Sequence, residues 1–193
     1  MTMEQLTANG TRELLGPEEL QRTLWRLSRE LQERHPDGEA MLCGIVTRGA
    51  FLTARLLQLI RSQGGTGWAG VTLDVGPYRD DGPRPAPSQT TPAFPLPRAV
   101  AESVRDRVVV LVDDVLFHGR TGRAALAALG DLGRPRAVEL LVVVDRGHRE
   151  LPLRATYVGR NLPTSEGERV LVRLSECDGQ DAVLLRSSEQ EQP

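Results

Sequence analysis

The sequence predicts an α/β fold with a mainly parallel central sheet flanked by helices. Two observations carry this prediction: short apolar runs of buried-strand length recur along the chain, and segments with a helical hydrophobic period lie between them. Strands that alternate with helices are joined by crossover connections, which make neighbouring strands parallel. A length of 193 residues fits one domain, so we expect residues 1–193 to form a single domain.

The first helix is expected at residues 17–34. Pro17 stands at an early helical position, and the acids Glu18 and Glu19 follow it where the helix dipole favours negative charge. At about 100° per residue, one face of this helix is a narrow apolar stripe. The stripe consists of Leu20, Leu24, Leu27 and Leu31, and the opposite side carries Arg22, Arg26 and Arg29, with Trp25 beside them.

A strand, a loop and a second helix follow. Residues 41–46 form a continuous apolar run, MLCGIV, which is typical of a strand buried on both faces. The run stops at Thr47-Arg48-Gly49, and we expect a helix at residues 50–62. A short strand at residues 71–75 leads to the polar segment Tyr78-Arg79-Asp80-Asp81.

The stretch 82–97 is rich in proline, which lacks a backbone donor and forbids a continuous helix or central strand. A domain linker is one interpretation. Strands of similar character lie on both sides, however, so we favour an exposed loop within one domain. The remaining elements are expected to be a strand at 107–112, a helix at 121–129, a strand at 138–144 and a strand at 169–174.

The composition excludes several classes of protein. All 24 basic residues are Arg, so a Walker-type phosphate loop, Schiff-base catalysis and pyridoxal phosphate attachment lack their Lys. Cys43 and Cys177 have neither zinc-ligand spacing nor a disulfide framework. A net charge of −2 gives no bulk attraction to nucleic acid, so any such binding needs a local patch. With no secretory signal and no long apolar run, we expect a cytoplasmic protein with no membrane partner.

Candidate chemistry concentrates where the run VVVLV ends. There the chain reads Asp113-Asp114, then a short loop with Gly119, then a helix. In an open parallel sheet, the ligand crevice lies at the carboxyl ends of the strands. Backbone N–H groups between Phe117 and Thr121, with the helix N-terminus, could surround a phosphate, while the two acids suit ribose hydroxyls. The alternative is an ordinary surface turn, where Asp and Gly are common.

The segment VVVLVDDVLFHGRTGRAAL resembles the phosphoribosyl diphosphate motif of type I phosphoribosyltransferases. With Gly44 to Gly49, Tyr78 to Asp81, Val144 to Pro152 and Asn161 to Ser165, it resembles the PyrR family more narrowly. This family combines control of pyrimidine operons, through binding of leader mRNA, with uracil phosphoribosyltransferase activity. The resemblance implies a type I phosphoribosyltransferase fold with a flexible loop at about 79–100 and a small hood at about 145–170.

The implied reaction joins uracil to phosphoribosyl diphosphate and gives UMP and diphosphate, with Mg²⁺ as cofactor. The resemblance makes Arg48, Asp113 and Asp114 the catalytic residues. Mg²⁺ would be held through diphosphate and ribose near the two acids, with no directly assigned protein ligands. The substrate-binding residues that the resemblance implies are Thr47, Arg48, Gly49, Arg79, Asp113, Asp114, Val115, Leu116, Phe117, His118, Gly119, Arg120, Thr121, Arg146 and Val170.

The resemblance also implies binding of pyrimidine leader mRNA in response to UMP or UTP, assembly into a homodimer or larger homo-oligomer, and no DNA partner. The implied RNA-binding residues are Arg26, Arg29, Arg34, His148, Arg149, Arg154 and Arg160. An ordinary solvated basic helix face is the alternative. The family usually has Tyr and Thr where this chain has Phe117 and His118, so a regulator with weak catalysis stays open, as does a nucleobase phosphoribosyltransferase with no RNA role.

Overall fold

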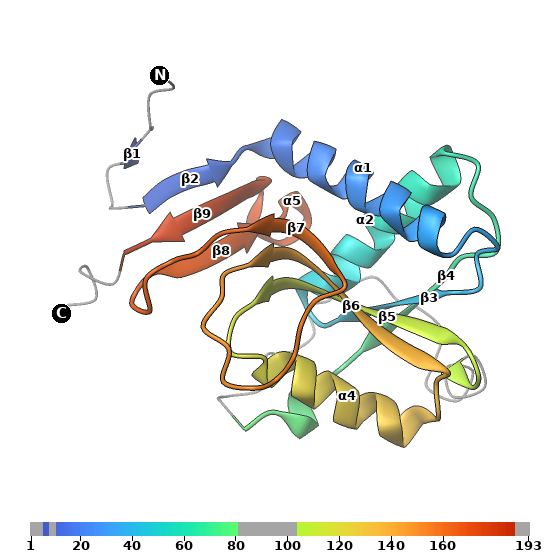
Figure 1. Cartoon of the computed structure of the whole chain (residues 1–193). Coiled ribbons are helices and arrows are strands. Elements are labelled where there is room, and N and C mark those ends of the chain that lie inside the picture. The colour runs from blue at the N-terminus through green and yellow to red at the C-terminus, as the bar shows by residue number, and fades with distance from the viewer. Residues whose placement is uncertain (1–5, 8–10, 81–103, 188–193) are drawn as a thin grey trace.

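The structure is a computed structural model that describes residues 6–7, 11–80 and 104–187 (Figure 1). Its strands are β1 (Leu6–Thr7), β2 (Thr11–Leu15), β3 (Met41–Ile45), β4 (Ala69–Leu73), β5 (Val108–Leu116), β6 (Ala137–Asp145), β7 (Tyr157–Asn161), β8 (Arg169–Arg173) and β9 (Ala182–Arg186). Its helical elements are α1 (Pro17–Arg34), α2 (Arg48–Ser62), the short 3-10 turn η1 (Gly76–Tyr78), α4 (Arg120–Leu132) and α5 (Ser175–Asp178).

Five strands form the central sheet in the order β4-β3-β5-β6-β7, and all neighbours are parallel. Helices α1 and α2 cover one face and α4 covers the other (Figure 1). The leucine stripe of α1 is buried in the core with the apolar side of α2, as its periodicity predicts. The expected α/β sheet with flanking helices is therefore confirmed.

A second, antiparallel sheet combines both ends of the chain in the order β1-β2-β9-β8. The segment 145–170, expected to form the hood, runs from the end of β6 to the start of β8. It contributes β7 to the edge of the central sheet, and loops precede and follow this strand. The loop expected at 79–100 lies outside the described residues from Asp81 onward. The described helices include none that is long and apolar enough to cross a membrane.

Most predicted elements lie where the sequence places them, and α1 has the expected bounds. Glu19 strengthens the start of this helix by accepting a hydrogen bond from the Gly16 N–H at 3.2 Å. The predicted end of the central strand at Val112 was wrong, because β5 continues to Leu116. Strand β3 pairs with β5 only as far as Val112. Strand β6 pairs with β5 as far as Leu116, so the last residues of β5 are held in the sheet by β6.

Candidate active site

The acidic pair lies within β5, where only β6 still pairs with the strand. Successive side chains of a strand point to opposite faces, and this alternation separates the two carboxylates. Asp113 lines a cavity on the α4 side of the sheet. Asp114 lies on the α2 side, where its Oδ2 is 4.0 Å from Nε of Arg48. The two acids can therefore contact different parts of one ligand that lies across the end of the strand.

Two glycines bring the start of α2 against the central sheet. A Cβ on Gly49 would stand 2.1 Å from the carbonyl oxygen of Val112, and a Cβ on Gly44 would stand 2.5 Å from the carbonyl oxygen of Gly49. Neither contact is possible for a real side chain, so both positions require glycine. The close approach places Arg48 beside Asp114. Thr47 is the N-cap of α2, and the peptide between Val46 and Thr47 is cis.

Arg48 also reaches the end of the second sheet. Its Nη2 donates to both carboxylate oxygens of Asp178, at 2.8 and 3.1 Å. Burial lowers the pKa of Arg48, but the charges of Asp114 and Asp178 raise it by more, so the guanidinium stays charged. Its Nε is buried and has no hydrogen-bond partner in the described part of the chain, which leaves a donor for a ligand.

The carboxyl groups of β5 are costly to ionise. Burial raises the pKa of Asp113 well above its usual value, and the neighbouring charge of Asp114 raises it further. Burial also raises the pKa of Asp114, although Arg48 and the N–H of Val115 oppose this shift. Two adjacent, poorly hydrated carboxyl groups favour a ligand that brings hydroxyl donors or positive charge.

A cavity of about 180 Å³ opens between the end of β5 and the start of α4. Among its lining residues are nine of the predicted substrate residues: Arg79, Asp113, Val115, Leu116, Phe117, His118, Gly119, Arg120 and Thr121. Gly119 is the N-cap of α4 and has a φ of 93°, a left-handed conformation that favours glycine. The first N–H groups of a helix have no partner within the helix, so the start of α4 suits an anion at this end of the cavity.

Aromatic and cationic groups stack beside the cavity. The Phe117 ring lies 3.5 Å from the His118 ring, and Cζ of Arg146 lies 3.7 Å from the Phe117 centroid. Arg146 is 4% exposed and donates from Nε to Oγ1 of Thr164 at 3.0 Å. Burial lowers the pKa of Arg146. A buried guanidinium held over an aromatic ring gives a flat and fixed surface against which a planar ligand can pack.

The chain matches a family model described as the phosphoribosyl transferase domain over residues 15–172. Bifunctional protein PyrR of Leifsonia xyli subsp. xyli is 49% identical over 182 residues, which cover 91% of this chain and 96% of that protein. Bifunctional protein PyrR of Streptomyces coelicolor is 47% identical over 186 residues, with coverage of 96% and 94%. The chain belongs to the PyrR family.

Solved structures agree with this assignment at the level of the fold. A hypoxanthine phosphoribosyltransferase from Staphylococcus aureus matches with a TM-score of 0.66 at 17% identity, over 94% of both chains. A hypoxanthine-guanine phosphoribosyltransferase from Leishmania tarentolae, in complex with GMP, matches with a TM-score of 0.64 at 15% identity, over 92% of this chain and 98% of that chain. The type I phosphoribosyltransferase fold is thus confirmed for this PyrR-family chain.

Three acids around the site were not among the predicted site residues. Asp178 binds Arg48, Glu150 accepts from Nε of Arg120 at 2.9 Å, and Asp80 lies 3.8 Å from Nη1 of Arg120. Glu150 lies in the segment 144–152 and Asp80 in the segment 78–81, and both segments carry the family resemblance. Asp178 lies more than a hundred residues after Arg48, and no local pattern pairs them.

Val170, expected near the base, lies on β8 with its side chain in the core, and the cavity does not include it.

The predicted RNA-binding residues divide among separate places. Arg26 and Arg160 line an open groove of about 360 Å³ between α1 and β7, together with Arg22, Glu19 and other residues. Arg26 is fixed there because its Nη2 donates to the carbonyl oxygens of Val158 and Gly159, at 3.2 and 2.6 Å. The structure thus brings Arg160, from the second basic cluster of the sequence, beside Arg22 and Arg26 of α1.

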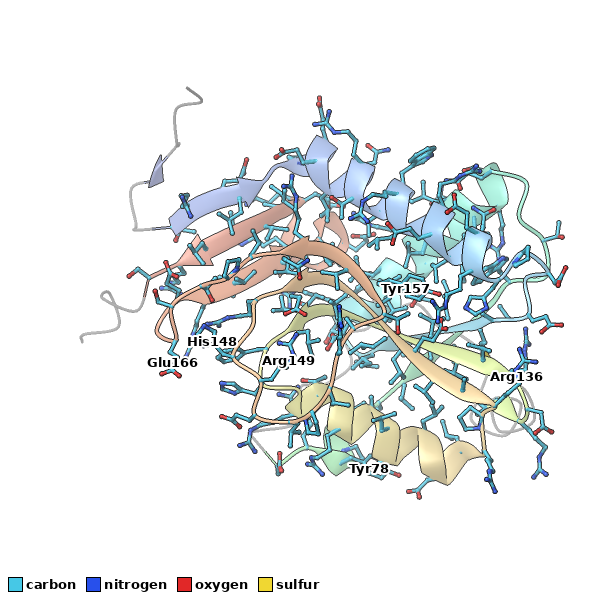
Figure 2. All side chains as sticks on the ribbon, in the orientation of Figure 1. Tyr78, Arg136, His148, Arg149, Tyr157 and Glu166 are labelled. Atoms are coloured by element: carbon cyan, nitrogen blue, oxygen red, sulfur yellow. The ribbon has the colours of Figure 1, made fainter. Side chains whose placement is uncertain are left out.

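The other predicted RNA residues lie outside this groove. Arg29 is exposed on α1, and Arg34, near its end, donates from Nε to Glu139 at 2.7 Å. His148 and Arg149 lie on the loop after β6 (Figure 2), and His148 faces the edge of the Phe117 ring at 6.0 Å. Arg154 lines a different cavity, beside α4.

Proposed function

We propose that this chain transfers a phosphoribosyl group from phosphoribosyl diphosphate to uracil, giving UMP and diphosphate, and regulates pyrimidine operons by binding leader mRNA. One observation carries the catalytic half. Asp113 and Asp114 stand on opposite faces of the end of β5, one beside an anion-suited cavity and the other beside Arg48. A phosphoribosyl diphosphate carries an anionic group at each end of a ribose. The cavity at the start of α4 and the Arg48 side chain lie on either side of the two acids, so each can take one of these anionic groups.

In the proposed complex, the 5′-phosphate lies at the loop between Phe117 and Thr121, at the start of α4. The ribose hydroxyls contact Asp113 and Asp114, and the diphosphate lies at the Thr47-Arg48-Gly49 turn. Arg48 neutralises the leaving diphosphate as its bond to the ribose breaks. No covalent nucleophile is needed, because the protein aligns the two substrates and stabilises the separating charges.

Mg²⁺ is part of this proposal, and the side chains present fit it. Carboxylate oxygens are its preferred protein ligands, and the raised pKa values of Asp113 and Asp114 mean that a cation would offset their charge. In the described part of the chain, no three His, Cys, Asp or Glu side chains converge on one point. Oxygens of the diphosphate and ribose would therefore complete its coordination, and the ion would supply charge neutralisation for the leaving group.

We place the uracil on the side of Arg146 and Phe117, near the segment 145–170 proposed as the hood. The flat guanidinium and ring form a rigid wall there. Steady-state formation of UMP from uracil, compared with the reactions of hypoxanthine and guanine, tests this assignment. A preference for either purine would contradict uracil specificity, and no reaction with any base would leave only the regulatory half.

The regulatory half rests on the groove between α1 and β7. Arg22, Arg26 and Arg160 give it positive charge in a chain of net charge −2, so the charge is local. Arginine pairs with phosphates and stacks on unpaired bases, and single-stranded loops are the usual targets of sequence-specific RNA recognition. We include Arg29, Arg34, His148 and Arg154 in the proposed RNA surface.

Binding of a pyrimidine leader RNA and of an unrelated hairpin, each with and without UMP or UTP, tests the regulatory half at stated salt. Tighter binding of the leader RNA when nucleotide is present is the expected result. Equal affinities for both RNAs would contradict the proposal. We further propose a single domain, a homodimer or larger homo-oligomer, and action in the cytoplasm, where transcripts are made.

A further inference from the structure

Three consecutive carbonyl groups at the end of β5 are held by the loop after β6. The Leu116 oxygen accepts from the N–H of Arg146 at 3.1 Å, and the Phe117 oxygen accepts from Nη1 of Arg149 at 2.7 Å. The His118 oxygen accepts from the N–H groups of Glu150 and Leu151, both at 3.1 Å. The loop therefore fixes the orientation of three peptide groups in a row.

This orientation has a direct effect on the opposite edge of each peptide. In a trans peptide, the N–H points away from the C=O of the preceding residue. Carbonyls directed at the loop therefore turn the N–H groups of Phe117, His118 and Gly119 the other way. Phe117, His118 and Gly119 line the cavity, whereas none of residues 145–153 does. Consecutive N–H groups that converge on one space form a nest for an anion.

Arg149 is the side chain that holds this arrangement together. Its guanidinium donates to four backbone carbonyl oxygens, those of Leu116, Phe117, Gly147 and Leu153, at 3.3, 2.7, 2.9 and 3.1 Å. Nη2 also pairs with the carboxylate of Asp145, which balances its charge. The side chain is 22% exposed, and its donors face the protein. Lysine has no planar fork of donors and could not make the same set of bonds.

We propose that Arg149 is a positioning residue for the nucleotide 5′-phosphate, acting by aiming the N–H groups of Phe117, His118 and Gly119 into the cavity. The inference rests on the proposed phosphoribosyl transfer at this site. It gives Arg149 a role inside the protein, distinct from the direct RNA contact that the family resemblance implies. Since His148 precedes it on the same turn, Arg149 also ties the phosphate loop to the proposed RNA surface.

The test uses Arg149→Lys, which keeps the positive charge and removes the fork, beside Arg149→Ala and the control Arg136→Ala, an exposed arginine that pairs with Glu39. We expect both Arg149 variants to raise the KM for phosphoribosyl diphosphate and the Kd for UMP by about tenfold or more, while the KM for uracil, which has no phosphate, stays near wild type. Arg136→Ala should leave all three constants unchanged, because Arg136 does not line the cavity.

Two results would overturn the inference. The first is that both Arg149 variants keep the wild-type KM for phosphoribosyl diphosphate and the wild-type Kd for UMP. This result would overturn the inference even if the variants bound RNA more weakly. The other needs no variant: the amide signals of Phe117, His118 and Gly119 in the wild-type protein fail to shift when UMP is added at saturating concentration in an NMR titration. A wild-type chain that neither forms nor binds UMP contradicts the proposed function itself, so the two failures are distinguishable.

Discussion

Arg48 on α2 donates from Nη2 to both carboxylate oxygens of Asp178, at 2.8 and 3.1 Å, and so links the proposed diphosphate site to the end of the second sheet. Asp178 is itself fixed, because it accepts from the N–H of Leu174 at 2.9 Å. A guanidinium held by a fixed carboxylate meets its ligand in one orientation.

We therefore expect Asp178→Asn to raise the KM for phosphoribosyl diphosphate by about three- to tenfold, with a smaller change in kcat, because a charge-assisted hydrogen bond is lost. Steady-state kinetics with varied phosphoribosyl diphosphate measures this. The matched control is Asp181→Asn, since Asp181 binds Arg55 on the same helix instead of Arg48. Equal KM values in the two variants would remove Asp178 from the diphosphate site.

Asp114→Asn should lower kcat by about a hundredfold or more, as expected for loss of a group that stabilises developing charge. Folding should be preserved for a physical reason: the raised pKa of Asp114 means that burial disfavours its charged form. A neutral isostere removes that penalty, so the free energy of unfolding at pH 7 should stay the same or rise. Rate assays and denaturant unfolding check both halves, and a slow variant that is also unstable would contradict the assignment.

His118→Thr should lower the KM for phosphoribosyl diphosphate by up to about tenfold, because a hydroxyl can donate to the phosphate directly. In the structure, the His118 ring stacks on Phe117 at 3.5 Å, and its Nδ1 lies 3.6 Å from a Glu150 oxygen, so the ring is engaged beside the cavity. The comparison of wild type and variant in UMP formation measures this. A rise in KM would mean that the imidazole itself binds the phosphate.

Arg55 forms an ion-pair network with Asp181 and Glu176, at 2.7 and 2.5 Å. Its hydrogen bonds lower the pKa of both acids, against the opposing effect of burial. A lowered folded-state pKa adds stability that is present above the unfolded value and is lost as the pH falls through the folded value. Arg55→Met should cost about 1–3 kcal/mol at pH 7, and the difference from wild type should shrink below about pH 4.

Denaturant unfolding of wild type and Arg55→Met between pH 3 and pH 8 measures this difference. The control is Arg136→Met, whose partner Glu39 is 61% exposed at the side chain. An exposed pair contributes about 0.5 kcal/mol or less, so this variant should follow the wild-type curve. A constant gap between Arg55→Met and wild type across the whole pH range would show that the acids do not carry the effect.

The sequence predicted best what is local. The bounds of α1 follow from Pro17 and the leucine period, and the proposed phosphate loop lies in one contiguous motif. β7 was missed because it is an edge strand whose exposed residues, such as Arg160 and Asn161, break an apolar pattern. β2 and β9 were also missed, and these two strands pair with each other from opposite ends of the chain.

The same limit applies to the site. Arg48 and Asp114 were predicted as partners of one ligand, and the structure brings them together through the glycine contacts at the start of α2. Arg149 donates mainly to backbone carbonyl groups, and every residue has such a group, so no residue type in the sequence identifies these partners. The sequence therefore suggested that Arg149 contacts a partner at the surface, whereas in the structure its donors are directed into the protein.

The groove between α1 and β7 leads to the last prediction, on RNA affinity. Arg26 supports the backbone of β7 through Val158 and Gly159, so its removal would mix structural and electrostatic effects. Arg22→Ala and Arg160→Ala are cleaner, because both side chains are exposed along the groove.

Each of these two variants should weaken leader RNA binding by about three- to tenfold and reduce the slope of log affinity against log salt by about one, as expected for one lost phosphate contact. Arg136→Ala, at the far end of the central sheet (Figure 2), should change neither the affinity nor the slope. UMP formation should stay at the wild-type rate in all three variants, since none of these residues lines the cavity beside Asp113. An unchanged salt slope in both groove variants would place the RNA elsewhere on the protein, because a phosphate contact cannot be lost without releasing fewer counterions.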